Sequence, residues 1–365
     1  MRIGILGGGQ LGRMLALAAH PMGHEVITWS RAMSEPAAAV SKMVLGDFDN
    51  ETALAAFIAQ VDVVTYEFEN VPAETVESIA QVRPVRPGVK SLRIAGDRVS
   101  EKQLFRELGI GTAPFAAVNN ADELRRAVDE VGLPAVLKTR RFGYDGKGQA
   151  VLRDASELDG AWTSLGGVPC ILEGFMPFSR ELSILGVRSV SGEVRTYPLV
   201  ENVHQGGILR VTHAPALAVP KSMESAAHEA ISATLQELEH VGVLAMELFD
   251  VGGVLFANEI APRVHNTGHF SIEGAKTSQF ENHIRAVVGA PLGDTSLRGV
   301  SWMRNLIGRI PDEREVLKVP GAHLHLYGKS ERRARKVGHI TLSGEGPKSI
   351  AIGIEAISRL VIDDG

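Results

Sequence analysis

The sequence predicts a protein of mixed α/β and α+β class, in which a doubly wound parallel sheet precedes a small α+β module and a larger mixed α+β region. Strand and helix patterns alternate through residues 1–90, as parallel strands joined by crossover helices do. A short module containing both kinds of element occupies the middle of the chain, and strand patterns dominate from residue 180 onward. With 365 residues, the chain is long enough for about two or three domains.

The first region alternates four apolar strand patterns with helical patterns. The segments that predict buried strands are "RIGIL" (2–6), "EVITW" (25–29), "MVLGD" (43–47) and "DVVTYE" (62–67). The helical patterns are "LGRMLALAAHPM" (11–22) and "ETALAAFIAQ" (51–60). The prolines of "PVRPGV" (84–89) interrupt the alternation and indicate a boundary.

The middle module begins with a helix at about residues 98–108 that ends at Gly109. A second helix is expected in "ADELRRAVDEVG" (121–132), with Asp122 as its N-cap. The predicted strands of this module are "FAAV" (115–118), "PAVLKT" (134–139), "QAVLR" (149–153) and "PCILEGF" (169–175).

The last region contains strands, one long helix at 221–241, and a final helix after the last strand. The predicted strands are 181–190, 193–200, 207–215, the two arms of the hairpin 243–263, "AHLHLYG" (322–328) and "GHITLS" (338–343). A basic segment, "KSERRARK" (329–336), separates the last two of these strands.

Composition narrows the class of protein. The chain is 44% hydrophobic and 22% charged, as globular proteins are, and its net charge of −5 argues against a general nucleic-acid binder. Its one cysteine, Cys170, lies in an apolar run and is expected to be a buried strand residue. One cysteine cannot form an internal disulfide, which fits a reducing cytoplasm. There is no signal-peptide pattern and no apolar run long enough to span a membrane.

The first strand is followed by a G-x-G-x-x-G motif, formed by Gly7, Gly9 and Gly12. A nicotinamide cofactor would also need an acidic residue at the end of the second strand, where the sequence has "WSR" (29–31) and no acid before Glu35. The oxidoreductase interpretation is therefore disfavoured. Backbone N–H groups at a helix N-terminus still favour an anion, such as the phosphate of a small substrate.

A second glycine-rich segment, residues 143–148, lies between two predicted strands. It is accompanied by Lys138, Arg140, Arg141 and Lys147. A plain hairpin turn would explain its Asp-Gly pair. The loop is longer than a tight turn needs, however, and its N–H groups and cations could close over a polyphosphate.

Glu247 and Glu259 lie in the two arms of the predicted hairpin. A two-residue turn at 252–253 would pair Glu247 with Asn258, whereas a loop of odd length would place the two glutamates side by side. Two adjacent carboxylates repel each other unless a cation lies between them, and magnesium prefers such ligands. The alternative is that one glutamate is exposed and the other pairs with Arg263.

Six segments together resemble a known family. They are "GGGQLGRM" (7–14), "YEFENV" (66–71), "DRVSEKQLF" (97–105), "KTRRFGYDGKGQ" (138–149), "ENVHQGGILR" (201–210) and "NEIAPRVHNTGH" (258–269). Their order resembles the ATP-grasp superfamily and, within it, the 5-(carboxyamino)imidazole ribonucleotide synthases. The resemblance implies a Rossmann-like domain at 1–97, an ATP-grasp lid at 98–176 and a C-terminal ATP-grasp domain with a strand-rich tail at 177–365.

The resemblance also implies a reaction. ATP, bicarbonate and 5-aminoimidazole ribonucleotide would give the N-carboxy product, ADP and phosphate through carboxyphosphate, in de novo purine biosynthesis. The implied cofactors are ATP and Mg²⁺, the implied assembly is a homodimer, and no nucleic-acid or membrane partner is expected. The nearest alternative is a formate-dependent glycinamide ribonucleotide transformylase, for which an acid is expected where this chain has Gln10. A non-catalytic nucleotide sensor is disfavoured because Glu247 and Glu259 are both present.

Each implied site residue is transferred by its matching motif. The nucleotide would be bound by Arg98, Lys138, Gly143, Tyr144, Asp145, Gly146, Lys147, Gly148, Gln149, Glu173, Gly174, Phe175, Met176, Glu181, His204, Asn258 and Glu259. The ribonucleotide would be bound by Gln10, Leu11, Glu67, Arg263, His265, Asn266, Lys329 and Arg335, the last two holding its 5′-phosphate.

Within that set, some residues are assigned more specific roles. Glu247 and Glu259 would bind the metal, and the catalytic residues would be Tyr144, Asp145, Lys147, Arg263 and His265. Asp145 could accept the proton lost by the amine. Many ATP-grasp enzymes have an asparagine two residues after the second metal glutamate, where this chain has Ala261.

Overall fold

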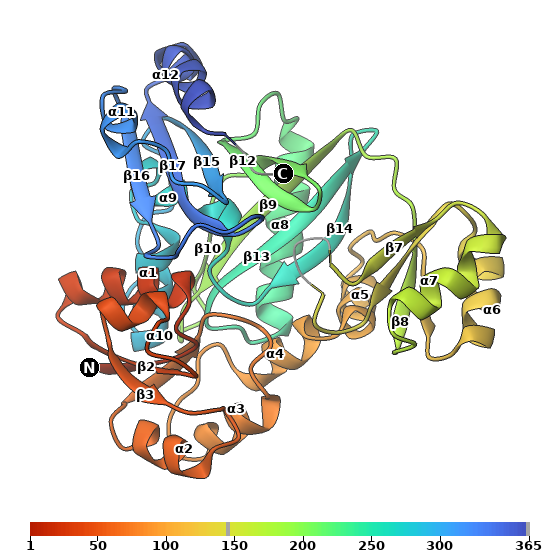
Figure 1. Cartoon of the computed structure of the whole chain (residues 1–365), viewed down its shortest axis with the longest axis horizontal. Coiled ribbons are helices and arrows are strands. Elements are labelled where there is room, and N and C mark those ends of the chain that lie inside the picture. Colours follow the sequence, from red (N-terminus) through yellow and green to blue (C-terminus); the bar gives the residue numbers. More distant parts are fainter. Residues whose placement is uncertain (144–146, 363–365) are drawn as a thin grey trace.

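The computed structural model of the protein describes residues 1–143 and 147–362. The N-terminal region is built on a four-stranded parallel sheet (Figure 1). Its strand order is β3-β2-β1-β4. The strands are β1 (Arg2–Leu6), β2 (Glu25–Ser30), β3 (Lys42–Leu45) and β4 (Val63–Tyr66). The helices are α1 (Gln10–Ala19), α2 (Glu51–Ile58), α3 (Ala73–Ala80) and α4 (Val89–Ala95), with short 3-10 turns at His20–Met22 and Pro36–Ala39. The expected parallel sheet is confirmed, and Val85 adds a further parallel bridge to Val64.

The middle module is an antiparallel sheet of order β5-β8-β6-β7, covered by helices and set to one side of the molecule (Figure 1). Its strands are β5 (Phe115–Val118), β6 (Ala135–Thr139), β7 (Gln149–Leu152) and β8 (Cys170–Gly174). Its helices are α5 (Arg98–Glu107), α6 (Ala121–Val131) and α7 (Leu158–Ser164), the last preceded by a 3-10 turn at Ala155–Glu157.

In this module, the predicted burial of Cys170 is confirmed and the predicted N-cap of α6 is wrong. Cys170 is the buried first residue of β8, as expected, and burial raises the pKa of its thiol to about 11. The N-cap of α6 is Asn120 and not Asp122, because the Asn120 side chain accepts the hydrogen bond from Glu123 N. Asp122 lies inside the first turn, where its charge still favours the helix dipole.

The third region is built on a sheet of nine strands within the described part of the chain. The order is β14-β13-β9-β11-β12-β15-β17-β16, with β10 paired to β9. The strands are β9 (Arg180–Arg188), β10 (Val194–Thr196), β11 (Val200–Gln205), β12 (Ile208–Ala214), β13 (Gly242–Val251), β14 (Val254–Ala261), β15 (Val300–Ile307), β16 (Ala322–Leu326) and β17 (Lys336–Gly344). Its helices are α8 (Lys221–Glu237), α9 (Ser271–Gly274), α10 (Gln279–Val288), α11 (Glu313–Leu317) and α12 (Pro347–Leu360), with a 3-10 turn at Asn266–Gly268.

Helix α10 joins the first region to the third. Its buried residues Phe280 and Ile284 belong to one apolar cluster with Ile3 and Leu15 of the N-terminal region and Val243 of the large sheet. The shared core fixes the N-terminal glycine loop relative to the large sheet. No helix in residues 1–143 or 147–362 has the length and apolar character needed to cross a membrane.

Candidate active site

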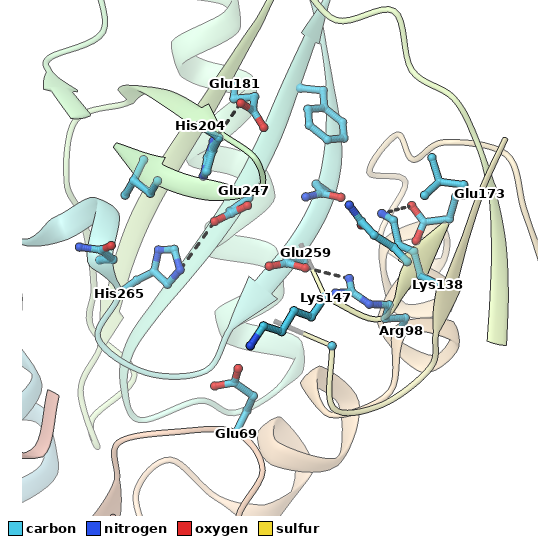
Figure 2. A pocket seen from close by; sticks show the side chains of 18 of the residues that line it. Glu69, Arg98, Lys138, Lys147, Glu173, Glu181, His204, Glu247, Glu259 and His265 are labelled. Carbon is cyan, nitrogen blue, oxygen red and sulfur yellow. Dashed lines mark hydrogen bonds and ion pairs between the residues drawn. The ribbon is translucent and has the colours of Figure 1, made fainter. Parts of the chain in front are cut away.

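A cavity of about 660 Å³ lies where the three regions meet. Its walls come from the N-terminal loops, the middle module and the large sheet (Figure 2). The predicted site residues that line it are Gln10, Leu11, Arg98, Lys138, Gly143, Lys147, Gln149, Glu173, Gly174, Phe175, Met176, Glu181, His204, Glu247, Asn258, Glu259, Arg263, His265 and Asn266. Residues Tyr144, Asp145 and Gly146 lie outside the described part of the chain. Gly148, Glu67, Lys329 and Arg335 are described but are not among the lining residues.

The two hairpin glutamates face each other, although not for the predicted reason. Glu247 pairs with Glu259 in the ladder between β13 and β14, so the predicted pairing is confirmed. The predicted odd-length loop is wrong, because Val251 pairs with Val254 across a two-residue turn. The ladder instead shifts beyond Glu247, where a β-bulge leaves Asn258 without a cross-strand partner.

Arg98 contributes to a difference in pKa between the two carboxyl groups, Glu247 and Glu259. Its Nη1 donates to Glu259 at 2.8 Å, whereas Arg263, the alternative partner of a hairpin glutamate, bonds to Glu69. Burial disfavours the charge on Glu259, but Arg98 outweighs it and lowers the pKa of that carboxyl. Burial and the charge of Glu259 raise the pKa of Glu247. A cation bound between the carboxylates would relieve this repulsion.

The oxygen atoms around the hairpin fit a magnesium ion that is also bound by its substrate. No three His, Cys, Asp or Glu side chains of the described residues could hold a metal by themselves. Asn258 lines the cavity next to Glu259. Its amide oxygen is buried and has no hydrogen-bond partner among the described residues. Magnesium usually takes one or two carboxylates and completes its shell with phosphate and water oxygens.

The opposite wall contains a buried carboxylate held by two lysines. Glu173 Oε2 accepts from Lys138 at 3.0 Å and lies 3.5 Å from Lys102 Nζ. Burial raises the pKa of Glu173, but the two lysines more than compensate and lower it to about 2. Its Oε1 has no hydrogen-bond partner among the described residues. Lys102 was not predicted as a site residue, although it lies one helical turn after Arg98 in "DRVSEKQLF".

Two histidines face the cavity, His204 from strand β11 and His265 from the segment that follows β14 (Figure 2). His204 Nδ1 lies 2.9 Å from Glu181, and this bond raises the pKa of His204 in spite of its burial. His265 Nε2 lies 3.6 Å from Glu247. Burial and the charge of Arg263 lower the pKa of His265 to about 3, so this ring is neutral near pH 7.

The segment that carries His265 is clamped by a residue that the sequence did not reveal. The Gln279 side chain accepts from His265 N at 2.8 Å and donates to His265 O at 2.7 Å. Asn266 is held by a reciprocal amide pair with Asn305, at 3.0 and 2.8 Å.

Arg263 bonds to Glu69, another cavity residue that was not predicted. Glu69 follows Glu67 by two residues in "YEFENV", which was the available signal.

The N-terminal glycine loop already binds an anion, and that anion is Glu67. The buried carboxylate accepts from Gly9 N and, at 2.7 Å, from Gly12 N. The expectation that these donors receive a substrate phosphate is therefore not met in this structure. Beside them, Lys329 donates to Gln10, which brings the tail to the loop.

Arg335, the second residue predicted to bind the phosphate, lies near Lys329, and neither residue lines the cavity. Arg335 Nη1 donates to Ser330 Oγ at 2.9 Å. Burial, followed by the charge of Arg335, lowers the pKa of Lys329. Lys336, the next residue, does line the cavity and was not predicted. Of the basic segment, Lys336 reaches the cavity lining, and Lys329 lies beside it through its bond to Gln10.

Comparisons with known proteins agree with this architecture. Residues 1–96 match the ribonucleotide synthetase pre-ATP-grasp domain, residues 103–280 the ATP-grasp domain, and residues 301–351 the phosphoribosylaminoimidazole carboxylase C-terminal domain. The chain is 48% identical over 361 residues to N5-carboxyaminoimidazole ribonucleotide synthase of Pseudomonas aeruginosa, covering 99% of each protein.

Solved structures share the fold over nearly the whole chain. The N5-carboxyaminoimidazole ribonucleotide synthetase of Thermus thermophilus is 51% identical, with a TM-score of 0.95 over 99% of both chains. The synthase of Aspergillus clavatus, solved with ADP and 5-aminoimidazole ribonucleotide, is 30% identical, with a TM-score of 0.89 over 98% of both chains. With its domain order, facing carboxylates and whole-length similarity, the chain belongs to the N5-carboxyaminoimidazole ribonucleotide synthase family of ATP-grasp enzymes.

Proposed function

We infer that the protein is an ATP-dependent carbon–nitrogen ligase that carboxylates 5-aminoimidazole ribonucleotide with bicarbonate. The observation that carries this inference is one continuous cavity. It has the facing glutamates, Arg98 and Lys138 on its ATP-grasp walls, and Gln10 at its N-terminal end. A phosphoryl donor and a second substrate can therefore meet in the same cavity.

The chemistry requires two successive transfers. A bicarbonate oxygen attacks the γ-phosphorus of ATP, ADP leaves, and carboxyphosphate forms. The exocyclic amine then attacks the carboxyl carbon, phosphate leaves, and the amine loses a proton. Carboxyphosphate must be protected from water, so the reaction requires the site to exclude solvent while this intermediate exists.

The side chains divide these tasks. Glu247, Glu259 and Asn258 would hold magnesium, which neutralises charge on the transferring phosphoryl group. Arg98 and Lys138 would supply further positive charge to the phosphates. We assign the proton of the amine to Asp145, on the resemblance of its motif, because a carboxylate can act as a general base.

The side chains proposed to bind the ribonucleotide favour aminoimidazole ribonucleotide over glycinamide ribonucleotide. Gln10 is neutral and bonds to Lys329. A cationic amine such as that of glycinamide ribonucleotide would be repelled by this lysine, whereas the uncharged aromatic amine of aminoimidazole ribonucleotide would not. A homodimer in the cytoplasm belongs to the same proposal, and sedimentation of the purified chain tests the dimer.

The decisive experiment measures ADP release with two substrate pairs. Bicarbonate with aminoimidazole ribonucleotide should support turnover, and formate with glycinamide ribonucleotide should not. A Glu259→Gln variant is the control for a contaminating ATPase, because it should lose turnover with the first pair. Turnover with the formate pair alone would contradict the proposed function.

A further inference from the structure

Helix α5 contacts the backbone of the β14 bulge through two adjacent buried side chains, Glu101 and Lys102. The Lys102 ammonium donates to the carbonyl oxygens of Ala257 at 3.1 Å and Asn258 at 2.7 Å. The Glu101 carboxylate accepts from Ile260 N at 2.6 Å. The two side chains therefore bind backbone groups on both sides of the second cavity glutamate.

The bulge decides which way that glutamate points. With the observed two-residue turn, a regular ladder would place Asn258 opposite Glu247 and would send Glu259 to the other face of the sheet. The extra residue restores Glu259 to the face of Glu247. It also allows Asn258 and Glu259, which are consecutive, to line the same cavity. A regular strand points consecutive side chains to opposite faces.

We propose that Glu101 and Lys102 are positioning residues that hold the bulge and thereby keep the Glu247–Glu259 pair in metal-binding geometry. Neither lines the cavity, so they act through the backbone of β14. The inference rests on the proposed magnesium site. The same helix begins with Arg98, which binds Glu259 directly, so α5 fixes both the carboxylate and the chain that carries it.

The two positioning residues differ in what else they contact. Lys102 also lies 3.5 Å from Glu173, on the wall opposite the hairpin. The Glu101 side chain accepts from Ile260 N and lies close enough to Glu259 for the two charges to interact. Lys102→Met should therefore weaken the binding of metal-free ADP as well, whereas substitutions of Glu101 leave the contact with Glu173 in place.

Two substitutions at Glu101 separate its hydrogen bond from its carboxyl group, whose pKa is raised to about 8 by burial and by the charge of Glu259. Glu101→Gln keeps an oxygen that can accept from Ile260 N and cannot ionise. Glu101→Asp keeps the carboxyl group and is one methylene too short to reach. We expect Mn²⁺ binding in the presence of ADP, followed by electron paramagnetic resonance, to stay within about 3-fold of wild type for Glu101→Gln and to weaken about 10-fold for Glu101→Asp.

The controls separate this effect from general destabilisation. Glu77→Asp makes the same chemical change on helix α3, where Glu77 pairs with Arg93 away from the hairpin, and should leave Mn²⁺ binding unchanged. Binding of ADP without metal should be the same in Glu101→Asp and wild type. If the aspartate variant lowers thermal stability but not Mn²⁺ affinity, Glu101 is only structural and the inference is wrong.

Two other outcomes would also overturn the inference. If Glu101→Gln weakens Mn²⁺ binding and Glu101→Asp does not, the carboxyl group of Glu101 matters and its bond to the bulge does not. If wild type itself binds no Mn²⁺ with ADP, the proposed metal site fails, and the positioning role fails with it. In that last case the substrate-pair assay still tests the ligase reaction separately.

Discussion

Single side chains set the charge state of the cavity. Arg98 keeps Glu259 ionised by a 2.8 Å bond, while Glu247, which has no such partner, has its pKa raised by burial and by its neighbour. His265 is held neutral by burial and Arg263. The cavity therefore presents an ionised carboxylate beside a weaker acid, which is suited to receive a divalent cation.

At this scale we predict the effect of Arg335→Ala. Burial and then the charge of Arg335 lower the pKa of Lys329, and a bound phosphate dianion would relieve the repulsion between these cations. The phosphate does not react, so its contacts should affect binding more than turnover. We expect the KM for the ribonucleotide to rise about 10-fold or more, with kcat and the KM for ATP nearly unchanged.

Steady-state kinetics with each substrate varied in turn checks this expectation. The matched control is Arg332→Ala, which removes an exposed arginine of the same segment and should leave both KM values unchanged. A rise in the KM for ATP would instead place this segment at the nucleotide.

At the scale of elements, the bulge and the turn of the β13–β14 hairpin have separate roles. The turn residues Gly252 and Gly253 have φ values of +62° and +88°, which most side chains adopt only with strain. The turn fixes the start of the ladder, and the bulge fixes the face on which Glu259 lies. Stability and metal binding should therefore respond to different substitutions in one hairpin.

We predict that Gly253→Val lowers the free energy of unfolding by about 1 to 2 kcal/mol, because a β-branched residue is strained at positive φ. No atom lies within 4 Å of the added Cβ, so the cost is conformational and not steric. Denaturant titration measures it. Gly252→Asn is the control, since asparagine tolerates this conformation, and it should change stability by less than about 0.5 kcal/mol.

Metal binding gives this prediction a second test. Because the bulge and not the turn places Glu259, Gly253→Val should bind Mn²⁺ with ADP as wild type does. Loss of Mn²⁺ binding in the folded variant would show that the turn controls the carboxylate pair.

The sequence predicted most strands and helices. It failed where a local pattern does not show which strand pairs with which, or in what register. Alternation of strand and helix was enough for the N-terminal sheet, because each strand there is a short apolar run. Strand β15 was not predicted, since "VSWMRNLI" is buried on both faces and lacks an alternating pattern. Residue counting could not reveal the bulge at Asn258, which depends on contacts with Glu101 and Lys102, far away in the chain.

The site shows the same limit. Motifs identified the residues that line the cavity directly, such as Glu247 and His265. They did not identify Gln279, whose contribution is two hydrogen bonds to the backbone of another segment. Such residues have no chemical signature of their own, so only the folded arrangement reveals them.

At the scale of the whole molecule, two buried histidines join the N-terminal region to the large sheet. His283 Nδ1 accepts from Val243 N at 3.0 Å, which leaves Nε2 to donate to Thr65 at 2.8 Å. His240 Nε2 donates to Val243 O at 3.0 Å, and its Nδ1 accepts from Ser91 at 2.9 Å. Protonation of His283 at Nδ1 would place a second donor against the Val243 N–H group, whereas a protonated His240 would require the Ser91 hydroxyl to rotate and accept.

These contacts predict an acid-sensitive junction. Burial lowers the pKa of His240 to about 4 and that of His283 to about 3, from 6.5 in the unfolded chain. Because the folded pKa is the lower one, protons favour the unfolded state, and stability is lost as the pH falls below 6.5. At pH 5.5 each histidine should cost about 1.4 kcal/mol relative to pH 7.5.

The test compares unfolding free energies at the two pH values in wild type and in His283→Gln, whose amide can make both neutral bonds. The variant should lose about 1.4 kcal/mol less than wild type on acidification. His228→Gln, at a half-buried histidine that bonds to Thr196 on the far side of the sheet, serves as the control and should behave as wild type. Equal losses in all three proteins would exclude the junction as the acid-sensitive element.

The strand order of the large sheet has a consequence for synthesis of the chain on the ribosome. Strand β12 pairs on one side with β11, which precedes it, and on the other with β15, which is made about ninety residues later. Until β15 and β17 have emerged, β12 exposes a row of unpaired backbone groups to other nascent chains. Slow translation between residues 250 and 300 should therefore increase aggregation more than equally slow translation before residue 200, when β12 has not yet been made.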